Sequence, residues 1–137
     1  MQAQEAQGER YVAVAERAIA EGQRGRLDST AVLWVIAASE LWIGSADEPQ
    51  GNSLPTSPLV VGREGGDGVL LAVFTGAELL APMLGERVPV RVPGFELLRR
   101  MPPGTDVVVN PGHSVGMELP ADTVARFVAD IAAVSIP

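Results

Sequence analysis

The chain contains no cysteine and no lysine among its 137 residues. Without cysteine it has no disulfide, no thiolate metal ligand and no cysteine nucleophile. Without lysine it lacks a Schiff-base amine and the lysine of a phosphate-binding loop. There is one histidine, His113, so only a carboxylate cluster would suit a metal ion, and the acidic residues are not clustered along the chain. We therefore expect neither a metal nor a cofactor.

Aromatic residues and long apolar runs are also scarce. Only 4% of the residues are aromatic although 47% are hydrophobic, so the core is built mainly from Val, Leu, Ala and Ile. No apolar run approaches the roughly 20 residues of a membrane span. The first ten residues, MQAQEAQGER, lack the basic and apolar regions of a signal peptide. These absences predict a cytoplasmic protein that has no membrane partner.

Acidic residues outnumber basic residues, 17 to 10. The formal net charge is −7, which would repel a polyanion and argues against nucleic acid as a partner. Arg99 and Arg100 form the only adjacent basic pair; such a pair is typical of a solvated helix face and otherwise makes a local basic patch. The mean hydropathy is nevertheless positive, at +0.20, which favours some apolar surface that meets a partner.

Hydrophobic periodicity predicts alternating helices and strands. Asp28 and Ser29 are helix-start residues, and the apolar run 30–39 after them reads as a helix followed by a strand at 40–43. Thr75 is expected to cap another helix. The remaining expected elements are a helix from Glu9 to Gly22, a hairpin of 59–61 with 69–74, a helix at 76–84, a strand at 88–92, a helix from Pro93 to Met101, a strand at 106–109, a strand at 115–119 and a helix from Pro120.

These elements predict an α+β fold in which helices pack against a mixed, largely antiparallel β-sheet. Strand 107–109 reads Val-Val-Val without alternation, which indicates a strand covered on both faces. Residues 1–8 are small and polar and are expected to form a disordered or frayed N-terminus. Residues 9–137 are expected to form a single domain.

Three segments resemble the bacterial "enhanced serine sensitivity" family, the SseB amino-terminal domain family. They are LAVFTGAELL at 71–80, PGFELL at 93–98 with PPG at 102–104, and VVVNPGHSVGMELP at 107–120. The last segment is the specific part of the resemblance, which extends over nearly all of the chain. It implies a mixed α/β fold and a soluble bacterial protein with no established catalytic residues. The chain does not resemble the type III secretion translocon subunit that shares the family's name.

The segment 110–114 and Trp42 are the candidate ligand or interface residues. Asn110, Pro111 and Gly112 have the properties of a turn, because Asn bonds nearby backbone, Pro fixes φ and Gly permits positive φ. The alternative is a small anion or peptide site at the free amides of the turn. His113 and Ser114 are adjacent, and adjacent side chains in extended chain point to opposite faces, which disfavours a nucleophile and its base. Trp42 packs in the core or, if exposed, contacts a protein.

The missing catalytic residue types and the positive hydropathy favour a non-catalytic protein-interaction or structural module. Its expected partner is another protein or a second copy of the chain. The alternative is a small-ligand sensor for an amino acid or an anion, with a site near Asn110 to Ser114. We expect no enzymatic activity under either hypothesis.

Overall fold

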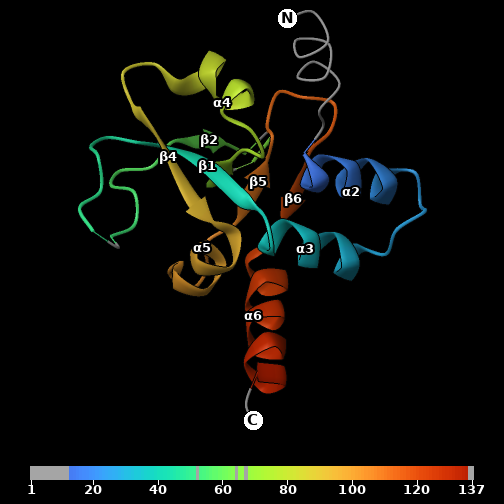
Figure 1. The fold of residues 1–137 in the computed structure, drawn as a ribbon. Coiled ribbons are helices and arrows are strands. Elements are labelled where there is room, and N and C mark those ends of the chain that lie inside the picture. Colours follow the sequence, from blue (N-terminus) through green and yellow to red (C-terminus); the bar gives the residue numbers. More distant parts are fainter. Residues whose placement is uncertain (1–12, 52, 64, 67, 136–137) are drawn as a thin grey trace, which may run out of the picture.

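The computed structural model describes residues 13–51, 53–63, 65–66 and 68–135 (Figure 1). The elements in chain order are α2 (Val14–Gln23), α3 (Ser29–Ala37), β1 (Glu40–Ser45), β2 (Val60–Gly62), β3 (Val69–Val73), α4 (Ala77–Leu84), β4 (Val88–Pro93), α5 (Gly94–Arg100), β5 (Val107–Val109), β6 (Met117–Leu119) and α6 (Ala121–Ser135).

The described strands form two sheets. β1 pairs with β4 in an antiparallel pair, and the other four strands lie in the order β2-β3-β5-β6. In this second sheet β3 and β5 are parallel and the other pairings are antiparallel. The backbone of Trp42 in β1 exchanges hydrogen bonds of 2.7 and 2.9 Å with Phe74, directly after β3, and so connects the two sheets. The predicted α+β fold with a largely antiparallel arrangement is confirmed.

Helices cover both faces of the four-stranded sheet. Leu71 and Val73 of β3 point into the main core, which α2, α3, α5 and α6 complete. Ala72 of β3, and Phe74 after it, point the other way into a smaller cluster beneath α4. In Figure 1, α4 lies at the opposite end of the molecule from α6, which runs from the sheet toward the C-terminus. Strand β5 also contributes to both clusters, which confirms that Val107–Val109 is covered on both faces.

The apolar run after Asp28 does form a helix and then a strand. Ser39 closes the helix by donating its hydroxyl to the Val35 carbonyl oxygen at 2.7 Å, and β1 starts at the next residue. The start of the first expected helix and the expected disordered segment 1–8 lie outside the described residues.

One expected side-chain role differs in the structure, and one aromatic residue is more exposed than its apolar helix would suggest. Thr75 does not cap α4; the N-cap residue is Gly76, and the Thr75 hydroxyl instead accepts a hydrogen bond from Asn110. Trp34 of α3 is 45% exposed, and its ring contacts Phe127 of α6 edge-on with centroids 5.1 Å apart. In both cases the side chain contacts a residue far away in the sequence.

Asp106 joins the sheet to α6. Its Oδ1 accepts a 2.7 Å hydrogen bond from the backbone N–H of Ala121, the first residue of α6. Its Oδ2 lies 2.7 Å from the guanidinium of Arg63, which also binds Glu118 of β6 at 2.7 Å. A carboxylate at a helix N-terminus satisfies a free amide and interacts favourably with the helix dipole.

We expect Asp106→Ala to lower the free energy of unfolding by about 1–2 kcal/mol, the usual contribution of a helix cap. Chemical denaturation monitored by circular dichroism measures this loss. Glu118→Ala is the matched control, because it removes the other partner of Arg63 and leaves the α6 amide bonded. An equal loss in the two variants would show that the Ala121 hydrogen bond contributes nothing.

Candidate functional site

The predicted site segment lies at the carboxyl ends of the parallel strands β3 and β5. Val73 and Val109 are register partners, and each is the last residue of its strand. Asn110 follows β5, and its backbone N–H donates to the Val73 carbonyl oxygen at 2.8 Å. Thr75, two residues beyond β3, lies beside it. The carboxyl ends of parallel strands often border ligand sites in α/β sheets, so the contacts of Asn110 decide what this segment can do.

Asn110 is buried, and its side-chain amide is fully bonded inside the protein. Only 1% of the residue is exposed. The Oδ1 atom accepts a hydrogen bond from the Thr75 backbone N–H at 3.0 Å. The Nδ2 group donates to the Thr75 hydroxyl and to the Val115 carbonyl oxygen, each at 3.0 Å. Both amide hydrogens are therefore used, and neither is left to bind a ligand.

The backbone of Asn110 explains the choice of residue. Its φ is +56°, in the left-handed region that Asn tolerates better than other side chains. Gly112 follows with φ of +83°, which agrees with the predicted Asn-Pro-Gly turn. The His113 N–H donates to the Asn110 carbonyl oxygen at 3.2 Å and closes the turn. The geometry of this segment supports the structural interpretation of the turn.

The loop after the turn is held against helix α2. The Gln23 Nε2 group donates to the carbonyl oxygens of Ser114 and Gly116, at 3.1 and 2.9 Å. Gly116 also lies so close to β5 that a Cβ atom there would come within 2.5 Å of the Val109 carbonyl oxygen. The roles of Gln23 and Gly116 were not predicted from the sequence. These two residues lie about 90 positions apart, and no local pattern indicates that they are in contact.

His113 and Ser114 are both exposed, and their contacts involve different partners. The His113 Nε2 atom lies 3.0 Å from the Leu79 carbonyl oxygen of α4. Because a carbonyl only accepts, Nε2 carries the hydrogen in this contact. The histidine ring also lies edge-on to Phe74, with centroids 6.4 Å apart. Ser114 contributes its backbone carbonyl to Gln23. These contacts attach the loop to α4 and α2.

Trp42 lies apart from this loop, on β1. It is half-buried and packs against the cluster beneath α4. The guanidinium carbon of Arg91 lies 6.0 Å from its ring centroid, at the outer limit of a cation–π contact, and Arg91 also pairs with Glu40 at 3.0 Å. Trp42 borders a hollow of about 540 Å³ that also contains Glu16, Glu40 and Glu78. The structure thus brings Asn110, Gly112, His113 and Ser114 together and leaves Trp42 at a separate place.

An apolar groove that the sequence analysis missed lies on the other side of the fold. It has a volume of about 440 Å³ and is bordered by β2, β3, the loop before β2, and the end of α5. Val60 and Val69, from the two strands of the hairpin, line it and are 42% and 58% exposed. The other walls include Leu54, Pro55, Pro58, Met101 and Pro102. Their apolar character was visible in the sequence, but their convergence depends on the tertiary fold.

Two common features are absent from the part of the chain that the structure describes. No group of three or more His, Asp or Glu side chains there is arranged to hold a metal ion. None of the helices in the same part of the chain has the length and apolar character needed to cross a membrane. A small-ligand site at 110–114 stays a prediction.

Comparison with known proteins gives one match. No curated protein matches the chain, and no solved structure does. Residues 15–126 match the family described as the SseB protein N-terminal domain, which covers well over half of the chain. The match includes β3, α5 and the strand-turn-strand segment around Asn110, where the resemblance was recognised. The chain therefore belongs to the SseB protein N-terminal domain family.

Proposed function

We propose that this chain is a non-catalytic protein-interaction module that binds a segment of another protein in the apolar groove beside β2. The exposed valines of the hairpin carry the proposal. Val60 and Val69 lie on the same face as Leu71, and α5 leaves this part of the face uncovered. A cluster of exposed apolar side chains is a common feature of protein contact sites.

The edge of the sheet supports an extended binding segment. β2 is the first strand of its sheet and pairs with β3 on one side. The Leu59 carbonyl oxygen accepts from the Ala72 N–H of β3, and the Arg63 N–H donates to the Gly68 carbonyl oxygen just before β3. The Leu59 N–H donates to the Gly44 carbonyl oxygen of β1. The alternation of an antiparallel ladder therefore directs the backbone groups of Val60 and Gly62 outward. Neither residue makes a further hydrogen bond to the part of the chain that the structure describes. A peptide added along β2 would bond to these groups and place alternate side chains in the groove.

The bonding of the loop at the parallel strand ends supports the non-catalytic part of the proposal. The buried amide of Asn110 and the ring nitrogen of His113 are both bonded to other protein groups. We extend the proposal to a bacterial, cytoplasmic location, which the resemblance to the bacterial SseB family supports.

The test compares two exposed valines. Val69→Asp places a carboxylate in the groove, whereas Val14→Asp places one at a similarly exposed position on α2, outside the groove. The measurement is the retention of peptides from a random displayed library on each immobilised variant. We expect Val69→Asp to lower retention about tenfold or more, since an unpaired charge in an apolar contact is costly. Val14→Asp should retain the peptides as the original chain does.

Two checks make the result decisive. Circular dichroism establishes that both variants fold, and sedimentation velocity measures self-association. A dimer that Val69→Asp separates would identify a second copy of the chain as the bound protein. Equal retention by Val69→Asp and the original chain, or an equal loss in Val14→Asp, would contradict the proposed groove.

A further inference from the structure

A second hollow, lined by arginines, adjoins the apolar groove. Its volume is about 710 Å³, and it lies between the loop before β2, strand β4 and helix α5. The ionisable side chains that line it are Arg91, Arg99, Arg100 and Glu96, which give a local charge of about +2. The whole chain carries a net charge of −7, so this hollow has the opposite sign to the average surface.

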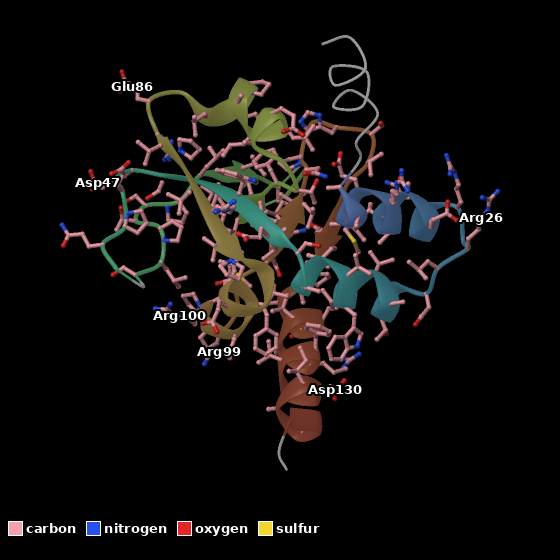
Figure 2. All side chains as sticks on the ribbon, viewed as in Figure 1. Arg26, Asp47, Glu86, Arg99, Arg100 and Asp130 are labelled. Carbon is pink, nitrogen blue, oxygen red and sulfur yellow. The ribbon has the colours of Figure 1, made fainter. Side chains whose placement is uncertain are left out.

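Helix α5 and Leu54 connect the two depressions. Leu54 borders both of them. On α5, Glu96, Arg99 and Arg100 face the arginine-lined hollow, while Leu97 borders the apolar groove, as does Met101 after the helix. Figure 2 shows Arg99 and Arg100 next to each other on one side of α5, with Arg26 on the far side of the molecule. A segment that follows the groove therefore passes close to these two arginines.

The exposed pairing of Arg99 leaves this side chain able to bind a partner. Arg99 pairs with Glu96 at 2.7 Å, and both side chains are about half exposed, at 52% and 41%. An exposed pair of this kind contributes about 0–1 kcal/mol and exchanges easily for another carboxylate. The exposed pair of Arg91 with Glu40 is of the same kind, and the Arg91 guanidinium carbon also lies 6.0 Å from the Trp42 ring centroid. Arg99 can therefore exchange Glu96 for an incoming acidic group, and the exposed Arg100 lies beside it on α5 and borders the same hollow.

We infer that the segment bound in the groove is acidic as well as apolar. Its apolar side chains occupy the groove lined by Val60 and Val69, and its carboxylates bind Arg99 and Arg100. A guanidinium presents paired N–H donors that match a carboxylate. The apolar contact alone would accept many partners, whereas the arginines select among them by charge and increase the rate of encounter. This inference rests on the proposed function, because it specifies the chemistry of the partner for the same groove.

Peptide selection with charge-reversed variants tests the inference. A random displayed library is selected on the original chain, and the enriched peptides are sequenced. We expect them to be richer in Asp, Glu and apolar residues than the input library. The double variant Arg99→Glu with Arg100→Glu should lose the enrichment in acidic residues and keep the enrichment in apolar ones. A selected acidic peptide should bind this variant about tenfold or more weakly, and the affinity difference should shrink at high salt.

The matched control reverses two other arginines. Arg24→Glu with Arg26→Glu changes the net charge equally, and both positions lie on the α2–α3 connection, exposed and outside the two depressions. We expect this control to select acidic peptides and to bind them within about twofold of the original chain. If circular dichroism shows that the glutamate variant at 99 and 100 is unfolded, Arg99→Gln with Arg100→Gln takes its place and should reduce the acidic enrichment.

The outcomes separate the inference from the function on which it rests. Enriched peptides that depend on Val69 but are neutral or basic would overturn the inference and leave the groove as a binding site. Acidic enrichment that persists after reversal of Arg99 and Arg100 would also overturn it. Selection that yields no peptide sensitive to Val69→Asp would overturn the proposed function itself.

Discussion

Asn110→Ala should lower the free energy of unfolding by about 3–5 kcal/mol, one of the two largest losses we expect in this protein. The substitution removes hydrogen bonds to the Thr75 backbone, the Thr75 hydroxyl and the Val115 carbonyl. Each such bond contributes about 1 kcal/mol, and a buried group left without a partner costs more. Alanine also fits the φ of +56° poorly, at a cost of about 1–2 kcal/mol. Urea denaturation of the variant and the original chain measures the difference.

Asn110→Gly separates the two contributions. Glycine adopts positive φ without strain, so the variant loses the side-chain hydrogen bonds but keeps the backbone conformation. We expect it to be more stable than Asn110→Ala by about 1–2 kcal/mol, the cost of holding alanine at positive φ. If both variants unfold within about 1 kcal/mol of the original chain, the buried amide is not the centre of the strand-end structure.

The pH dependence of the stability of Asn110→Asp tests which atoms of the Asn110 side chain donate and which accept. One carboxylate oxygen can still accept from the Thr75 N–H, but the other would face the Val115 carbonyl oxygen, which has no hydrogen to offer. Burial beside an acceptor raises the pKa of the introduced carboxyl in the folded state. The stability loss relative to the original chain is therefore smallest in acid and increases as the pH rises through the carboxyl range. A loss that is independent of pH would contradict the assigned orientation of the amide.

The turn at Asn110 shows where the sequence was informative and where it was not. Asn, Pro and Gly in a row specify a turn through their own backbone preferences, and Gly112 has the positive φ that the turn predicts. The positive φ of Asn110 was not predicted. The partner of the Asn110 side chain lies 35 residues away, at Thr75. The local sequence predicted that Thr75 would cap α4. In the structure its hydroxyl instead accepts a hydrogen bond from Asn110. The helix-then-strand assignment after Asp28 was right, and Asp28 is the N-cap residue of α3, although its side chain makes no capping hydrogen bond.

The groove was unpredictable for a related reason. Alternating and apolar runs identified the hairpin that contains Val60 and Val69, but not which of its valines a helix would cover. Coverage depends on α5, which has seven residues and leaves these two side chains exposed. Arg99 and Arg100 were noted as a solvated face or a local patch, and their position beside an apolar groove appears only in the folded chain.

Gly94→Ala is the second substitution with a large expected effect. Gly94 is the first residue of α5, and its N–H donates to the Ser39 carbonyl oxygen at 2.7 Å. A Cβ atom at this position would lie 2.4 Å from the Ile36 carbonyl oxygen and 2.9 Å from that of Ser39. These atoms belong to the backbone at the end of α3 and in the turn before β1, so they cannot move away by rotation of a side chain. Relief of the overlap requires α5 and α3 to separate.

Two effects of opposite sign decide the size of the change at Gly94. Alanine in a helix is favoured over glycine by about 1 kcal/mol, which would stabilise the variant. Steric overlap in a packed interior costs about 1–3 kcal/mol, and more where backbone must move and a hydrogen bond such as that to Ser39 is lost. The overlap is the larger effect, and we expect a net loss of about 2–4 kcal/mol by chemical denaturation. Gly62→Ala is the control, because a Cβ atom there meets nothing within 4 Å. If Gly94→Ala were as stable as Gly62→Ala, the close approach of α5 to the end of α3 would not be a feature of the folded protein.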